Sequence, residues 1–572
     1  MKYLKFLQFL FIALLCFGCN EDEFLNETNP NSITTDTFWK TEAEFNSGLT
    51  SVYSALQFQS VSGGELVYEM IMGDIAGTES WYRPTAFRNF TFNDGIYHVT
   101  DKWAELYIGI FRANQVIQNL ETADQSIFAD NRRNEIEGQA KFLRAWFYWQ
   151  LAHTYCGAVI HTEIIENDDD FHKPFSTIEE VTESIIKPDL EFAMANLPRE
   201  WKGDDLGRVT WGAAASQLGK VYLYDEDWGN AASTFKEVID SDIYRLVPDI
   251  RDNWSDENEL NEESIFEVVF SNDINPGINA EAVDDNYFEK GAEASTMATE
   301  LGQLNFGAFN TLLPTYSLHE LFVNDEVDPD NPLNTDNTQS ARLSASICPI
   351  NGETLFYGLP IGEKGGWAFG QSAYVKKYTN WYDQSAEDAQ RRSGINFRHI
   401  RLADVYLMYA EAVLESSGDV NTAIDYIDRI RSRAGVITLA DYISDNGGKF
   451  PAMHTSKSIR GPHKLVDPSV STLLTHIMRV ERPLELCFEG HRWKDLVRWG
   501  NAKEIFDDLL KDEQYRNTFA VILNLNNGGS APLFIQERIR PDFILAAENY
   551  SPVQHDCFPI PTQEKQINKL IN

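Results

Sequence analysis

The densest group of potentially reactive side chains lies between residues 481 and 498. The segment reads ERPLELCFEGHRWKDLVR, with acids and bases three residues apart. Residues at this spacing are neighbours on a helix, where opposite charges form ion pairs. The spacing therefore indicates structural ion pairing rather than catalysis, and the predicted pairs are Arg482–Glu485, Glu489–Arg492, Arg492–Asp495 and Asp495–Arg498.

Motifs for nucleophilic, metal or phosphate chemistry are missing. The chain has no G-x-S-x-G, no S-x-x-K in a convincing setting, and no second His four residues after His491. Gly212 to Lys220 has the wrong spacing for a phosphate-binding loop. We predict no metal and no cofactor. A glycosidase carboxylate pair stays open, because the separation of two acids in space cannot be read from a sequence.

One acidic segment offers oxygen ligands. Asp325 to Asn337 contains Asp328, Asp330, Asn334 and Asp336. Calcium accepts such oxygens, but the segment lacks the Gly and the terminal Glu of an EF-hand loop. A solvated loop is the favoured interpretation, and calcium binding stays open.

The residue types that recognise sugars gather in one early loop. Aromatic rings cover the C–H face of a sugar, and charged or amide side chains bind its hydroxyl groups. Residues 73–84, GDIAGTESWYRP, combine both types in Asp74, Glu79, Trp81, Tyr82 and Arg83. Further candidates are Trp367 with Phe369, beside two glycines, and the pair Trp381 and Tyr382. For every one of these rings, burial in the core is the competing interpretation.

Composition limits the ligand classes. The chain has 572 residues, and its 48 Lys and Arg against 87 Asp and Glu give a net charge of −39. Polyanions need clustered Lys and Arg, so nucleic-acid binding through a basic surface is excluded. Neutral sugars, cations and small peptides remain possible. Aromatic residues make up 12%, including 13 Trp; some of these rings must belong to the core, and the number leaves candidates for a binding surface.

The N-terminus reads as a lipoprotein signal. Lys2 and Lys5 precede an apolar run that ends in Leu15-Cys16-Phe17-Gly18-Cys19. This run is too short to span a bilayer comfortably, and a small residue before a cysteine suits lipoprotein cleavage. We predict a signal peptide at 1–18, lipid on Cys19 and a tether over 19–35. An ordinary signal peptide cut elsewhere is the alternative. No later segment has eighteen consecutive apolar residues.

The remaining cysteines carry no recognisable pattern. None of Cys156, Cys348, Cys487 and Cys557 belongs to a C-x-x-C pair. We interpret all four as buried, unreactive thiols and predict no disulfide.

The body of the chain reads as helices separated by long irregular segments. Apolar residues at spacings of three and four predict helices over 134–155 and 397–416. Residues 221–240 and 412–431 align with each other, and each predicts a helix–turn–helix unit. Residues 63–101 and 242–393 are rich in Gly, Pro, Asn and Asp, with short strand-like runs at 264–270 and 374–378. No linker divides the body, so residues 36–572 are predicted to form one domain.

Several motifs in order resemble the SusD/RagB family along nearly the whole mature chain. They are SIT…FW at 32–39, EIEGQAKFLRAWFYWQLAHTY at 135–155, GRVT at 207–210, RLADVYLMYAEAV at 401–413, IDRIRSRAG at 427–435, ERPLELCFEGHRWKDLVRWG at 481–500 and FPIPTQEK at 558–565. Two departures stand out. Pro483 predicts a break in the helix between Glu481 and Glu485. Cys156 occupies a turn where the family has Gly, and we expect only local consequences.

The resemblance implies more than the residues do by themselves. It implies a mainly α fold of about four tetratricopeptide-like helix pairs with large irregular insertions and a few short strands. The N-terminal part would span about 36–240 and the C-terminal part about 260–572. It implies a non-catalytic lipoprotein of the outer membrane, facing the cell exterior, with a SusC-like TonB-dependent transporter as its partner. The family's glycan site commonly uses an acidic residue and aromatics of the early loop, which Asp74 and its neighbours match.

Three functions are weighed against one another. Glycan binding for a transporter ranks first, binding of peptides or another nutrient on the same scaffold second, and a surface glycoside hydrolase last.

Overall fold

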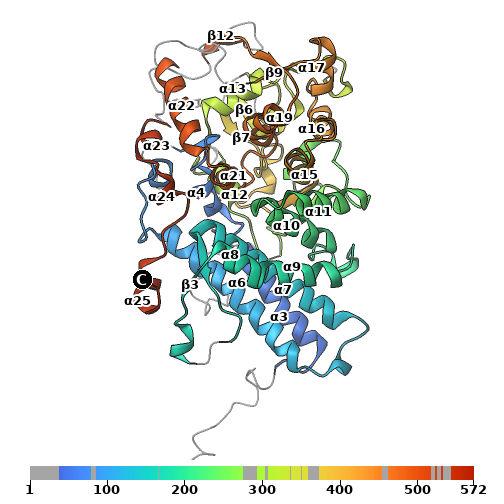
Figure 1. Ribbon diagram of the computed structural model, residues 1–572, viewed down its shortest axis with the longest axis vertical. Helices are drawn as coiled ribbons and strands as arrows, with labels where there is room; N and C mark the ends of the chain where they lie inside the picture. Colours follow the sequence, from blue (N-terminus) through green and yellow to red (C-terminus); the bar gives the residue numbers. More distant parts are fainter. Residues whose placement is uncertain are drawn as a thin grey trace, which may run out of the picture.

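The computed structural model describes residues 38–78, 85–164, 167–274, 293–302, 307–334, 337–349, 351–358, 373–453, 461–516, 522–524, 530–532 and 543–571 (Figure 1). Eight longer helices pack in chain order, each against the one before it and the one after it. In Figure 1 this series begins near the bottom and continues upward on the right-hand side. Taken two at a time, the helices are α3 (Glu42–Ser54) with α6 (Tyr97–Thr122), α7 (Arg132–Tyr155) with α9 (Lys187–Asn196), α10 (Trp211–Tyr224) with α11 (Trp228–Asp240), and α15 (Leu402–Ser417) with α16 (Val420–Ala434).

The mainly α fold is therefore confirmed, and the series of pairs is consistent with tetratricopeptide-like units. The predicted helix at 134–155 is α7, and it is buried on all sides by its neighbours. Trp146 is 1% exposed and Trp149 is 3% exposed. Helix α6 approaches it closely because Gly109 has no side chain, since a Cβ there would lie 2.5 Å from Cε2 of Phe147.

The two similar segments of the sequence are helix pairs in contact with each other. The first pair is α10 and α11, the second is α15 and α16, and α11 packs directly against α15. Asp227 is the N-cap of α11 and Asp419 that of α16, and each accepts a hydrogen bond from a backbone N–H three residues later. Such a carboxylate cap starts the second helix of each pair. The predicted repeat is confirmed at both places.

The predicted helix at 397–416 is wrong in its first five residues. Phe397–Arg401 forms strand β8, all of it buried, and pairs in antiparallel fashion with β4 (Ser264–Val268). Helix α15 begins only at Leu402, after Arg401 in an extended conformation. The helical spacing of apolar residues continued into the strand by coincidence, and pairing with a distant segment decided the conformation.

The strands form two-stranded ladders within the described part of the chain. Besides β4 with β8, the pairs are β1 (Ala76–Gly77) with β5 (Leu313–Pro314), β2 (Gly157–Val159) with β3 (Phe175–Thr177), β6 (Ile347–Pro349) with β7 (Ala373–Val375), β9 (Phe450–Ala452) with β10 (Lys464–Val466), and β11 (Ile522–Asn524) with β12 (Ser530–Pro532). The remaining helices are α4 (Val67–Met70), α5 (Thr85–Arg88), α8 (Ile178–Val181), α12 (Met297–Leu301), α13 (Tyr316–Asn324), α14 (Ala341–Ser346), α17 (Leu439–Asp445), α19 (Val470–His476), α20 (Arg482–Glu485), α21 (Arg492–Arg498), α22 (Ala502–Arg516), α23 (Ile544–Asn549), α24 (Pro552–His555) and α25 (Thr562–Ile567).

The break predicted at Pro483 does not occur. Between α19 and α20 the chain forms a π-helical turn, Ile477–Glu481, and the helical path continues to Glu485. The N–H of Arg482 donates to the carbonyl of Ile477, five residues back. Pro483 then occupies the first turn of α20, where a missing N–H costs little.

Three of the four ion pairs predicted within residues 481–498 are wrong, and only Asp495–Arg498 forms, at 3.0 Å. The segment is not one helix, because Phe488 and Gly490 have φ angles of 64° and 82° and separate α20 from α21. The other charges bind distant segments instead. Arg482 binds Asp404 and Asp495, Glu485 and Glu489 bind Arg401, and Arg492 binds Asp74.

Arg401 is the centre of a buried charge cluster. Its guanidinium lies 2.7 Å from Glu263, 2.7 Å from Glu485 and 2.8 Å from Glu489. The side chain is 1% exposed. Burial by itself would raise the pKa of Glu263, but Arg433 and Arg401 lower it to about 2. The contribution of Glu263 to stability is therefore present above pH 4.5 and lost as the pH falls toward 2.

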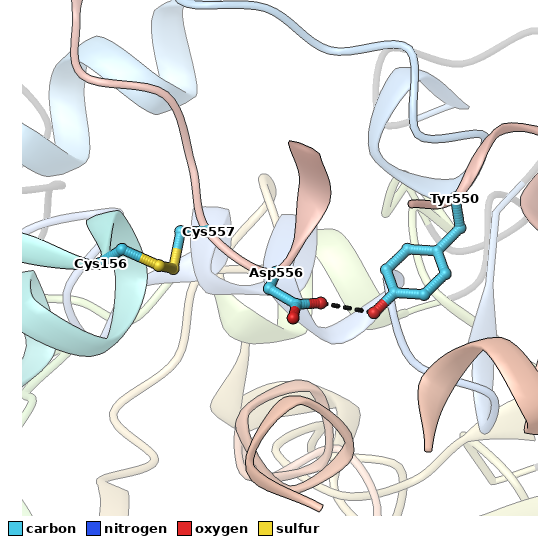
Figure 2. The surroundings of a disulfide bond; sticks show 4 residues. All are labelled: Cys156, Tyr550, Asp556 and Cys557. Carbon is cyan, nitrogen blue, oxygen red and sulfur yellow. Dashed lines mark hydrogen bonds between the residues drawn. A yellow bond between two sulfur atoms is a disulfide. The ribbon is translucent and has the colours of Figure 1, made fainter. Parts of the chain in front are cut away.

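The prediction of four free cysteines is wrong for two of them. Cys156 and Cys557 form a disulfide, with Cα atoms 5.6 Å apart across 401 residues of sequence (Figure 2). Cys156 ends α7 with φ at 61°, the left-handed conformation in which glycine is usual. The bond attaches the C-terminal segment to the end of α7, so its consequences are not local. Cys348 and Cys487 are free and buried, as predicted.

The described part of the chain offers neither a membrane-spanning helix nor a metal-binding cluster. No described helix is long and apolar enough to cross a membrane. No cluster of three or more His, Cys, Asp or Glu suited to a metal ion occurs among these residues. In the acidic segment, Asp325 binds Arg342 and Arg431, and the amide of Asn334 donates to the carbonyls of Asp328 and Gly435.

Replacing Arg401 by Met is expected to lower the free energy of unfolding by about 3–5 kcal/mol, because three buried carboxylates lose a shared partner. Chemical denaturation measures the loss. The matched control is Arg429→Met, since Arg429 pairs with Asp425 at the surface and is 46% exposed. That change should cost less than about 1 kcal/mol. Equal losses in the two variants would contradict the assigned role of Arg401.

Replacing Cys156 and Cys557 by Ser is expected to lower stability by about 2–5 kcal/mol, because the disulfide restricts the unfolded chain. Denaturation with and without dithiothreitol measures this. The reductant should lower the stability of the wild-type protein to that of the double variant and should leave the stability of the variant unchanged. The bond would be refuted if dithiothreitol left the stability of the wild-type protein unchanged and all four cysteines of the unfolded, unreduced protein could be alkylated.

Candidate functional site

Asp74, at the start of the early loop, is held by hydrogen bonds to its side chain and to its backbone carbonyl. Both carboxylate oxygens accept hydrogen bonds from Arg492, Oδ1 from Nε at 2.6 Å and Oδ2 from Nη2 at 2.7 Å. The Asp74 side chain is 13% exposed. Its backbone carbonyl accepts from the hydroxyls of Thr315 and Ser317. Asp74 therefore joins the loop to α21 and to the start of α13.

The strand that follows Asp74 is held from both sides. Strand β1 pairs with β5, and Arg88 of α5 donates to the carbonyls of Ile71, Gly73 and Ala76 at 2.8, 2.5 and 3.1 Å. Arg88 is 2% exposed. The segment therefore leaves a rigid strand at Gly77 and rejoins a rigid helix at Thr85. The remaining candidates of this loop, Glu79, Trp81, Tyr82 and Arg83, lie outside the described residues.

The second candidate segment, with Trp367 and Phe369, also lies outside the described residues. Its described neighbour is β7, which follows it directly in the chain. Strand β7 contacts β5, and β5 pairs with β1. Strands β1 and β7 thus both lie against β5, although almost 300 residues separate them in the sequence.

Trp381 and Tyr382 pack near strands β5 and β7. Both belong to a small apolar cluster with Leu313 of β5 and Tyr374 of β7. Trp381 is 8% exposed, and Nζ of Lys376 lies 3.9 Å from the centre of its ring. The hydroxyl of Tyr382 donates to the Asp256 carboxylate at 2.6 Å and accepts from the Asp256 N–H at 3.1 Å. Trp381 is therefore buried, and Tyr382 is half-buried with its hydroxyl bound to Asp256.

Buried titratable groups make the same region rigid. Burial raises the pKa of Glu387 to about 7, although hydrogen bonds from Asn380 and Tyr357 oppose the rise. The hydroxyl of Tyr357 donates to this carboxylate at 2.8 Å. Burial lowers the pKa of Lys376 to about 8. Glu387 accepts hydrogen bonds from Tyr357 and Asn380, and Lys376 donates hydrogen bonds to Ser344 and Thr354.

A second aromatic surface was missed in the sequence. Trp103, Tyr107 and Phe111 of α6 line a cleft of about 400 Å³, together with Phe171 and the helix α25. The three α6 residues are spaced by four, so they share one helix face, and that spacing is a signal the sequence carries. Phe171 and α25 could not be placed there from the sequence, because tertiary contacts bring them to α6. We call this surface the α6–α25 cleft.

Known proteins share this architecture. The fold places the chain in the class of helix-pair proteins that carry large loop insertions. Two family models match it, one described as "SusD family" over residues 262–571 and one described as "Starch-binding associating with outer membrane" over residues 23–223. The first model covers more than half of the chain. The protein belongs to the SusD family.

Similar proteins align over nearly their whole length. SusD-like protein P25 of Formosa agariphila is 25% identical, over 100% of this chain and 98% of that protein. The crystal structure of a SusD superfamily protein from Bacteroides vulgatus has a TM-score of 0.72 at 23% identity, covering 94% of this chain and 99% of that one. A laminarin-binding SusD-like protein has a TM-score of 0.64 at 23% identity, covering 93% and 99%. The structural matches support the fold alone.

Replacing Asp74 by Asn is expected to lower stability by about 1.5–3 kcal/mol, because Arg492 loses its buried charged partner. Chemical denaturation measures the loss. The control is Asp240→Asn, which removes an ion pair with Lys236 in which both side chains are more than 40% exposed. That control should cost less than about 1 kcal/mol. A D74N variant as stable as the wild type would refute the structural role.

Proposed function

We propose that the protein binds glycans at the surface of the outer membrane and passes them to a SusC-like TonB-dependent transporter, without chemical change. The observation that carries the proposal is family membership over both parts of the chain. One of the two family models is described as starch-binding, and one similar structure is that of a laminarin-binding protein. We assign the glycan site to the loop segments that carry Asp74, Glu79, Trp81, Tyr82, Arg83 and Trp367, with Trp381 and Tyr382 as their support.

The location at the cell surface has support from the fold itself. The proposed lipid anchor is Cys19, after removal of residues 1–18. A disulfide such as Cys156–Cys557 forms and persists in oxidising compartments and is rare in the cytosol. Export of the chain is the simplest way to place these two cysteines in such a compartment.

Charge favours neutral glycans as the ligand. The full chain carries a net charge of −39, and a strongly negative surface repels sulfated or uronic-acid polymers. The same charge does not repel starch-like or laminarin-like glucans, because these polymers are neutral. Neutral glucans are therefore the first ligands to test.

Replacing Trp81 by Ala is expected to weaken glycan binding roughly tenfold, about 1.4 kcal/mol, because a ring that covers a sugar face is lost. Isothermal titration with laminarin and soluble starch measures the affinity. The control is Trp228→Ala, a half-buried tryptophan at the start of α11 on the helical scaffold. The control should leave the affinity unchanged.

Two results would overturn the proposal. No binding of any neutral glycan, with peptides binding instead, would keep the fold and change the ligand class. Release of shorter sugars from a bound glycan, abolished by substitution of one acid, would make the protein a hydrolase. Chromatography of the glycan after incubation distinguishes binding from hydrolysis.

A further inference from the structure

The α6–α25 cleft has the features of a binding site apart from the insertion loops. It lies between α6, the residues His161, Glu163 and Phe171, and the C-terminal helix α25. Figure 1 shows α25 and the C-terminus beside the start of α6 and β3. Its volume of about 400 Å³ lies within the roughly 300–1,000 Å³ of small-molecule sites. We propose that this cleft is a second saccharide-binding site, specific for a neutral sugar; the proposal rests on the proposed glycan-binding function.

Aromatic rings form the floor and one wall of the cleft. Phe111 is 39% exposed and Phe171 is 48% exposed, so both rings present apolar surface. Tyr107 is fixed in place, because its hydroxyl donates to the carbonyl of Val159 at 2.9 Å and accepts from the Val159 N–H at 2.7 Å. The Trp103 ring centre lies 4.9 Å from that of Tyr107. The half-buried Tyr107 ring, fixed by these two hydrogen bonds, can cover the C–H face of a sugar with little loss of side-chain entropy, while Trp103, 6% exposed, packs against it as support.

Three polar side chains line the edge of the cleft. Glu163 and Gln563 are exposed, and Glu564 is half-buried. Within the described residues, none of these three side chains makes a hydrogen bond or an ion pair. Carboxylate and amide oxygens are acceptors for sugar hydroxyl groups, and the Gln563 amide is also a donor. A purely apolar ligand, such as a lipid chain, would bury these groups without partners and would bind poorly.

The charge of the lining selects neutral sugars. The lining contains Glu163 and Glu564 but neither Lys nor Arg. The remaining titratable group is His161, and burial lowers its pKa to about 4, so its ring is neutral at pH 7. An anionic sugar would meet two carboxylates and no cation, and is therefore excluded.

The disulfide positions one wall of this site. Cys557 precedes α25 by a few residues and is bonded to Cys156 at the end of α7. The N–H of Phe558 donates to the carbonyl of Thr154 at 2.6 Å, and the Asn568 amide donates to the carbonyl of Lys173 at 2.9 Å. These three attachments hold α25 at a fixed distance from α6. Without the covalent bond, the segment that carries Gln563 and Glu564 keeps these hydrogen bonds, the ion pair of Lys565 with Asp94 at 3.2 Å and the buried ring of Phe558.

The test combines Phe111→Ala and Phe171→Ala in one variant and titrates it with laminarin and with soluble starch. We expect roughly tenfold weaker binding of at least one of the two glycans, or loss of one of two binding events. The matched control is Leu206→Ala, an apolar side chain 61% exposed and outside the cleft, which should bind as the wild type does. Circular dichroism and the melting temperature confirm that the variants are folded.

Hydrogen–deuterium exchange separates this proposal from the loop site. In the Trp81→Ala variant, a saturating glycan is expected to protect residues 100–114 and 557–571, and the Phe111/Phe171 changes should remove that protection. The second site alone would be overturned by the following result: Trp81→Ala weakens glycan binding, the double Phe variant binds as the wild type does, and residues 100–114 and 557–571 gain no protection. No glycan binding by any variant or by the wild type would overturn both proposals.

Discussion

A buried charge must be paired, and this rule holds the C-terminal part of the molecule together. Arg401 ends β8 and is hydrogen-bonded to Glu263, Glu485 and Glu489, which come from two other segments. A second cluster places Arg342 and Arg431 between Asp325 and Glu481, with all four side chains fully buried. Removing any one of these groups leaves a charge in a medium of low polarity, so the segments can only be arranged in one way.

These clusters explain how a helical scaffold can carry long insertions without losing rigidity. Residues 242–393 enter and leave the scaffold through β4 and β8, and Arg401 binds Glu263 directly beside that ladder. Asp74 and Arg492 do the same for the early loop. The bases of the loops are thereby fixed. Binding proteins with loops on a rigid frame have the same arrangement.

The C-terminal segment is fixed by a different means. It is attached by the disulfide, by hydrogen bonds, by the Lys565–Asp94 ion pair and by the buried ring of Phe558, and it contributes a wall to the α6–α25 cleft. Buried ion pairs hold the loop bases, whereas a disulfide together with polar and apolar contacts holds α25.

The sequence by itself determined the helices, because the spacing of apolar residues in 134–155 and in the two similar segments specifies which face is buried. It also identified the family, through motifs that keep their order. It could not determine which groups meet across the fold. The strand at 397–401, the partners of Arg482, Glu485 and Arg492, the disulfide, and the union of Phe171 and α25 with α6 all join residues far apart in the chain. Only tertiary structure decides such contacts, since a buried group pairs with whichever partner the packing brings to it rather than with its neighbour in sequence.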